Sequence, residues 1–84
     1  MDRLEYELVT LYNGKQYFAL DSLMYEYDIY DLVLNVDDES DIKIVIQEIK
    51  NGKTVLNDVY DKYLLKTLAA MFKEKVESKQ NNIN

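Results

Sequence analysis

Residues 7–20 of the chain read ELVTLYNGKQYFAL, an alternating segment that is interrupted once in its middle. Apolar and polar side chains alternate with period two on both sides of the interruption, as in a strand with one buried face. The interruption is Asn13-Gly14, a pair typical of the type I′ turn because both central residues of that turn take a positive φ. The segment therefore predicts a β-hairpin.

A two-residue turn at this point also sets which residues lie opposite each other across the hairpin. The expected pairs are Leu11 with Gln16, Val9 with Phe18, and Glu7 with Leu20. The face predicted to pack in the core carries Val9, Leu11, Phe18 and Leu20. The opposite, amphipathic face carries Tyr6, Leu8, Thr10, Tyr12 and Tyr17.

Further strands follow along the chain. Residues 29–36 carry apolar side chains at alternate positions and predict a third strand, whose in-phase residues are Tyr30, Leu32, Leu34 and Val36. The acidic stretch 37–41 predicts an exposed loop, and the β-branched residues of 42–50 predict a fourth strand. Asn51-Gly52 repeats the hairpin signal, with residues 53–56 as a short return strand.

The period of the apolar residues then changes to that of a helix. The predicted helix begins between Asn57 and Asp61, and Asn57 or Asp58 can cap its first amide groups. Its stripe, at spacings of three and four residues, comprises Leu64, Leu65, Leu68, Met71, Phe72, Lys75 and Val76. We expect the helix to end near Lys79 and residues 79–84 to form a frayed tail.

These elements predict an α+β fold, in which one C-terminal amphipathic helix covers an antiparallel sheet of four to five strands with two Asn-Gly hairpins. A chain of 84 residues is short for two separate cores, so we expect one domain over residues 1–78, with one core, followed by the tail. No apolar run is long enough to cross a bilayer and no signal peptide is evident, so we expect a cytoplasmic protein without a membrane partner.

The composition argues against catalysis. The chain has no Cys and no His, which removes thiolate nucleophiles and the commonest acid–base group at neutral pH. Its serines have no histidine to activate them, and its two glycines fall in the predicted hairpins rather than in a phosphate-binding loop. We expect a non-enzymatic protein with no cofactor and no bound metal.

The acidic stretch has a partial likeness to a calcium-binding EF-hand loop. The first, third, fifth and twelfth places of that loop would be Asp37, Glu39, Asp41 and Glu48. The sixth place requires Gly for a sharp turn but holds Ile42, and no helix is predicted before the loop. We therefore interpret the stretch as an exposed loop.

Charge is distributed unevenly along the chain. The net charge of −6 is the sum of −9 over residues 1–41 and +3 over residues 42–84. Residues 21–41 contain eight acidic residues and no basic one. Such a surface repels the phosphate backbone, which argues against direct binding of nucleic acid, and it favours a partner protein with a basic surface.

Tyrosines are interleaved with these acids. Tyrosine is enriched in protein interfaces because it offers a large contact area with little side-chain entropy to lose. The residues that we predict to bind a partner are Tyr25, Glu26, Tyr27, Asp28, Tyr30, Asp31, Asp37, Asp38, Glu39 and Asp41. For the three tyrosines, ordinary packing in a sheet is the alternative, since β-propensity also favours Tyr.

The run from Glu7 to Lys75 resembles a family of small, acidic, uncharacterised proteins of low-GC Gram-positive bacteria and their phages and prophages. The residues that carry the resemblance are ELVTL (7–11), KQY (15–17), LNVDD (34–38), DIKI (41–44), the NGK hairpin (51–53) and the terminal amphipathic helix. The resemblance implies a β-rich sheet with a C-terminal helix and an origin in a mobile element. It implies no catalytic residues.

Together these features predict an inhibitor encoded by a phage or mobile element, acting in the cytoplasm of a bacterial host. Its target would be a nucleic-acid-handling defence protein, for example a CRISPR effector nuclease, because carboxylates can compete with phosphates for a positive channel. The alternative is a self-associating accessory or structural module of a phage or prophage, in which strand edges or the helix pair two copies as a homodimer.

Overall fold

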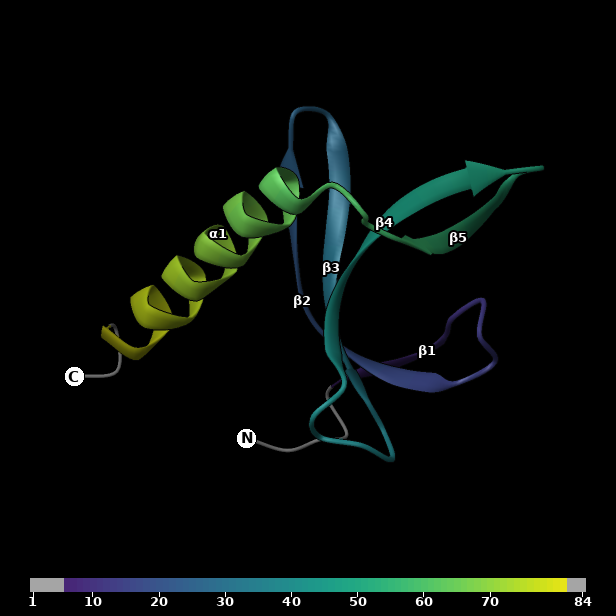
Figure 1. Cartoon of the computed structure of the whole chain (residues 1–84), viewed down its shortest axis with the longest axis horizontal. Helices are drawn as coiled ribbons and strands as arrows, with labels where there is room; N and C mark the ends of the chain where they lie inside the picture. Colours follow the sequence, from purple (N-terminus) through teal and green to yellow (C-terminus); the bar gives the residue numbers. More distant parts are fainter. Residues whose placement is uncertain (1–5, 82–84) are drawn as a thin grey trace.

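The computed structural model describes the backbone of residues 6–81 and the side chains of residues 6–78. Five strands are followed by one helix, which confirms the α+β fold predicted from the sequence (Figure 1). The elements are β1 (Glu7–Thr10), β2 (Gln16–Tyr25), β3 (Asp28–Asn35), β4 (Ile42–Lys50), β5 (Lys53–Asp58) and α1 (Lys62–Asn81).

The strands form one antiparallel sheet in the order β1-β2-β3-β4-β5, so each strand pairs with its neighbours in the sequence. The sheet is curled, and Figure 1 shows β1 and the β4–β5 hairpin extending to the same side of β3. The two edge strands therefore come to lie on either side of a groove, which residues of both β1 and β5 line.

Two of the connections are two-residue turns. Asn51 and Gly52 have φ values of 52° and 77° and join Lys50 to its partner Lys53, which confirms the predicted hairpin. Glu26 and Tyr27 have φ values of 48° and 74° and join Tyr25 to Asp28. Both turns have the positive φ pair of a type I′ turn, but the second achieves it without glycine.

The predicted hairpin at Asn13-Gly14 is confirmed, but its loop has three residues, so the register expected for a two-residue loop is wrong. Gly14 N–H donates to the carbonyl of Leu11 at 2.9 Å, Leu11 N–H donates to that of Lys15 at 3.1 Å, and Gly14 takes a φ of 80°. The side chain of Asn13 accepts a hydrogen bond from Lys15 N–H at 2.9 Å, which supports this conformation. Such a loop combines a type I turn with one left-handed residue and a bulge.

The extra loop residue shifts the register by one, so that Val9 and Leu11 stay on the core face as predicted but the β2 residues that share this face change. Val9 lies opposite Tyr17 and Leu8 opposite Phe18, rather than Val9 opposite Phe18. The predicted place of Tyr17 on the amphipathic face is therefore wrong, because its side chain is fully buried, at 0% exposure, together with Leu11. Phe18 takes the opposite face and is only half-buried.

A β-bulge divides β2 into two parts. The register with β3 shifts between Ala19 and Asp21, which leaves Leu20 as the extra residue. A bulge bends its strand and changes the face to which the following residues point. As a result Tyr17 packs inside the curl of the sheet, whereas Leu23 and Tyr25 pack on the side that α1 covers.

The apolar side chains form two clusters, one on each side of the central strands, instead of the single core expected. The cluster inside the curl is built from Leu11, Tyr17, Val33 and Val45. The cluster beneath α1 is built from Tyr30, Ile44, Leu68 and Phe72. This division arises because β3 and β4 are covered on both faces, as central strands often are in layered folds.

The helix begins later than predicted. Asn57 and Asp58 belong to β5, and the capping residue is Asp61, whose carboxylate accepts hydrogen bonds from Tyr63 N–H at 2.9 Å and Leu64 N–H at 3.2 Å. Residues 79–81 of the predicted tail are part of α1, and residues 82–84 lie outside the described residues. Within the described chain, α1 is too polar to cross a membrane.

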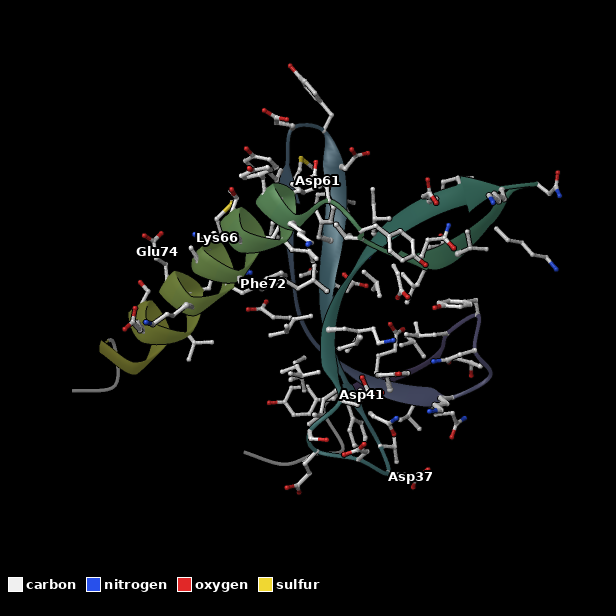
Figure 2. The ribbon with its side chains drawn as sticks, in the orientation of Figure 1. Asp37, Asp41, Asp61, Lys66, Phe72 and Glu74 are labelled. Carbon is white, nitrogen blue, oxygen red and sulfur yellow. The ribbon has the colours of Figure 1, made fainter. Side chains whose placement is uncertain are left out.

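One face of α1 packs on the sheet, as its periodicity predicts. Leu68 and Phe72 are buried, and Figure 2 shows Phe72 directed toward the sheet and Glu74 away from it. The ammonium group of Lys75 donates to the carboxylate of Asp21 at 2.9 Å and to the carbonyl of Ser22. This contact ties the C-terminal half of the helix to β2.

We expect Tyr17→Phe to lower the free energy of unfolding by about 1–2 kcal/mol, because the Tyr17 hydroxyl donates to the carboxylate of Asp41 at 2.6 Å. Urea unfolding followed by circular dichroism measures this change. Tyr27→Phe is the matched control and should stay within about 0.5 kcal/mol of the wild type, because Tyr27 lies on the surface. Equal stability of Tyr17→Phe and the wild type would show that the hydroxyl contributes nothing.

Candidate functional site

The ten residues predicted to bind a partner do not form one continuous surface. Tyr25, Glu26, Tyr27 and Asp28 lie at the β2–β3 turn, at one end of β3. The β3–β4 loop, with Asp37, Asp38, Glu39 and Asp41, lies at the other end of the same strand, as the labels of Asp37 and Asp41 in Figure 2 show. Tyr30 and Asp31 lie within β3 between the two ends.

The β2–β3 turn presents an aromatic side chain between two carboxylates. Tyr27 is 98% exposed and lies between Glu26 and Asp28, which are also exposed. Met24 and Ile29, an exposed cross-strand pair, extend the apolar surface beside the turn. We call these five residues, Met24, Glu26, Tyr27, Asp28 and Ile29, the turn surface.

The backbone of this turn is unusual for its sequence. A positive φ is disfavoured for residues with a Cβ atom, and such a residue costs on the order of 1–3 kcal/mol that the surrounding structure must offset. Here both central residues, Glu26 and Tyr27, are in that region. Strained residues concentrate at functional sites, so the turn is a candidate site on backbone grounds as well as by composition.

Two of the predicted tyrosines are packed rather than free. Tyr30 is 3% exposed and lies in the cluster beneath α1, and burial raises the pKa of its hydroxyl, with smaller contributions from Asp28 and Glu26. Tyr25 is half-buried against the same cluster. Tyr25 and Tyr30 therefore pack in the fold, which was the alternative to partner binding for these two residues.

Asp31 lies on the opposite face of the sheet, at the base of the groove between β1 and β5. It is 7% exposed, and the side-chain amide of Gln47 donates to its two oxygens at 3.0 and 3.1 Å. Burial raises the pKa of this carboxyl, and the charge of Glu7 raises it further, while the bond from Gln47 opposes the shift. Asp31 therefore lies buried in the groove and is not exposed with the residues of the turn surface.

In the β3–β4 loop the carboxylates have different environments. Asp37, Asp38 and Glu39 are exposed. Asp38 accepts hydrogen bonds from the hydroxyl of Ser40 at 2.6 Å and from its N–H at 3.0 Å, and these bonds lower the pKa of the Asp38 carboxyl. The loop therefore holds its exposed acids in a defined conformation.

Asp41 is part of a partly buried polar network. One of its oxygens accepts hydrogen bonds from the side-chain amide of Asn35 at 3.0 Å and from the hydroxyl of Tyr17 at 2.6 Å. These two bonds lower the pKa of the Asp41 carboxyl, with that from Asn35 contributing most. Its role is thus to fasten the loop to the cluster inside the curl.

No metal centre is built from the acidic stretch. Within residues 6–81, acidic side chains are not gathered in groups of three or more that could hold an ion. The place that would require Gly in an EF-hand loop is Ile42, which is the first residue of β4.

Sequence reasoning missed the groove between the edge strands and the residues that join its walls. The hydroxyl of Tyr12 donates to the carboxylate of Asp58 at 2.6 Å, which raises the pKa of that hydroxyl. Lys43 lies 3.8 Å from the other oxygen of Asp58 and 5.3 Å from the centre of the Tyr17 ring. No local signal marks these contacts, because Tyr12 and Asp58 meet only through the curl of the sheet.

Comparison of the chain with protein-family models, with curated proteins and with solved structures finds no match. The arrangement offers an exposed aromatic turn flanked by carboxylates, and a groove with a buried carboxylate at its base. Both are features of binding surfaces.

We expect Asp41→Asn to lower the thermal unfolding midpoint, whereas Asp37→Asn, the matched control in the same loop, should leave it unchanged. Because the folded-state pKa of Asp41 is lowered, its stabilising contribution is present above the unfolded-state pKa and is lost as the pH falls through the folded-state value. Differential scanning calorimetry across acidic pH checks both points. Identical midpoints for the two variants at neutral pH would contradict this role of Asp41.

The raised pKa of Asp31 predicts the opposite pH dependence. Protonation of this carboxyl favours the folded state, so its contribution is most favourable below the ordinary pKa of 3.8 and is lost as the pH rises through the raised value. Asp31→Asn cannot lose a proton, so the stability of the variant relative to the wild type should increase between about pH 4 and pH 7. Chemical denaturation at both pH values tests this, and a pH-independent difference would refute it.

Proposed function

We propose that this chain is a non-enzymatic binding protein that docks its turn surface on a basic patch of a partner protein. One observation carries the proposal: Tyr27, 98% exposed, is held between two carboxylates in a two-residue turn with two positive φ values and no glycine. A sequence selected for stability alone would place Asn-Gly there, as the β4–β5 turn of the same sheet does.

The geometry suits docking for two physical reasons. A tight turn between two paired strands holds the tyrosine in place before binding, so little conformational entropy is lost when its ring enters a pocket. Glu26 and Asp28 add charge complementarity, which accelerates association with a basic surface. The exposed acids of the β3–β4 loop add to the negative electrostatic potential of the molecule. They lie at the other end of β3 and do not contact the partner at the turn surface.

The partner that fits this surface best is a protein with a positively charged channel for nucleic acid. Carboxylates can occupy such a channel in place of phosphates, which would inhibit the protein. The resemblance of residues 7–75 to small acidic proteins of phages and prophages supports a host defence protein as the target, for example a CRISPR effector nuclease. The site of action would then be the cytoplasm of the bacterial host.

Self-association is the second candidate, and it is favoured by the edges of the sheet. Within residues 6–81, β1 pairs only with β2, and β5 pairs only with β4. Such edges can pair two copies of a chain. Analytical ultracentrifugation at micromolar concentration distinguishes the candidates, because a self-associating module sediments as a dimer without any partner.

The test of docking uses the turn itself. For this experiment, a photo-crosslinking phenylalanine analogue replaces Tyr27 and captures the partner from host lysate. The captured protein is then identified and purified for kinetic measurements. Tyr27→Ala should raise the dissociation rate at least tenfold. The double variant Glu26→Gln with Asp28→Asn should slow association at low salt and approach the wild type at high salt.

Two further variants separate binding from folding. Tyr63→Ala is the matched control, because Tyr63 is another exposed tyrosine, 86% exposed, but lies on α1. It should bind like the wild type. Replacing Glu26 by Asn and Tyr27 by Gly should stabilise the fold by about 1–2 kcal/mol, because the strain is relieved, yet abolish binding. Normal binding by this last variant would refute the proposal.

A further inference from the structure

The groove between β1 and β5 is a second candidate site, separate from the turn surface. Its volume is about 710 Å³, which lies in the range of ligand-binding clefts. Val9 and Leu11 of the first hairpin and Leu56 of β5 supply apolar walls, and Asp31 and Gln47 lie at its base. The bond between Tyr12 and Asp58 joins the two walls at one end.

Both walls are edge strands with unused backbone groups. In an antiparallel pair, every second residue directs its N–H and C=O away from its partner strand. Because β5 pairs only with β4 and β1 only with β2 within the described residues, these groups are available to an added strand. Binding of an extended peptide at such an edge is a common mode of recognition.

Among the described residues, the two carboxylates that line the groove form no ion pair. They are those of Asp31 and Glu7, and the charge of Glu7 raises the pKa of Asp31. Lys50 also lines the groove, from the β4–β5 hairpin, but the ion pairs formed among the described side chains of residues 6–78 are Lys43 with Asp58 and Lys75 with Asp21. Gln47 supplies a single amide nitrogen to Asp31, and a carboxylate can accept further hydrogen bonds.

We propose that this groove binds an extended, basic peptide segment of a partner protein, which adds as a strand along β5 with one Lys or Arg side chain directed at Asp31. β5 is the longer of the two edges, with six residues against four in β1. Side chains of a strand alternate between its two faces, so the residues two positions before and after the basic residue face the apolar walls. The recognised pattern is therefore apolar-x-basic-x-apolar.

The test is an NMR titration of the full chain with a capped synthetic pentapeptide, Val-Thr-Lys-Thr-Val. We expect chemical-shift changes in the backbone amides of β5 and in the side-chain amide of Gln47. The same peptide with Glu in place of Lys should bind at least tenfold more weakly, and a peptide with N-methylated backbone amides should not bind. Tyr27→Ala should bind the pentapeptide like the wild type, which keeps this test independent of the turn surface.

Protein variants locate the charge interaction. Asp31→Asn keeps the shape and an acceptor for Gln47 but removes the charge, so it should weaken binding of the Lys peptide at least tenfold and should strengthen binding of the Glu peptide, which is no longer repelled. Asp37→Asn, an exposed acid outside the groove, should bind like the wild type. Circular dichroism confirms that each variant is folded.

Several outcomes would overturn the proposal. Equal affinity for the Lys and Glu peptides, or no shift at millimolar peptide, would show that the groove is not a site for basic strands. Competition by butylamine at the same concentration as the peptide would assign the groove to a small amine. A dimer through β1 or β5 that the peptide does not dissociate would assign it to a second copy of the chain.

Discussion

The bulge at Leu20 is the constraint on which the rest of this structure depends, because it lets one long strand serve both faces of the sheet. Before the bulge, Tyr17 packs inside the curl, and after it Leu23 packs beneath α1. Without the change of face, the odd-numbered side chains of β2 would all lie on one side. The bend that a bulge introduces also helps the sheet to curl, and the curl brings the two edge strands to either side of one groove.

The acidic residues of this chain serve different physical roles, although they form one run in the sequence. Asp41 is held by Tyr17 and Asn35 and fastens a loop to the interior, and Asp21 holds the end of the helix through Lys75. Asp31 is buried and forms no ion pair with a described residue, and burial raises the pKa of its carboxyl, so a positively charged ligand group would stabilise its charged form. The acids at the two ends of β3 remain exposed and provide a negative field.

Each of the two proposed sites lies where the folded state carries a local free-energy cost. At the β2–β3 turn the backbone of Glu26 and Tyr27 is strained, and the paired strands on either side maintain it. In the groove the cost is electrostatic, since the Asp31 carboxylate is buried from water and forms no ion pair among the described residues. A cation bound in the groove can offset the cost of the buried charge, so ligand binding there should stabilise the fold. Docking at the turn does not relieve the backbone strain, because the partner binds a conformation that the turn already has.

The sequence by itself determined the local elements of this protein: alternating strands, the Asn-Gly turn at 51–52, the amphipathic helix, and an acidic segment with tyrosines. These features depend on residues close together in the chain, so their patterns are readable without a structure. Only the tertiary structure decided which face each strand presents, because a three-residue loop at Tyr12–Gly14 and a bulge at Leu20 each shift the register by one residue. For the same reason it alone separated the buried Asp31 and the partly buried Asp41 from the exposed Asp28 and Asp37, and it alone placed β1 and β5, far apart in the sequence, on the two walls of one groove.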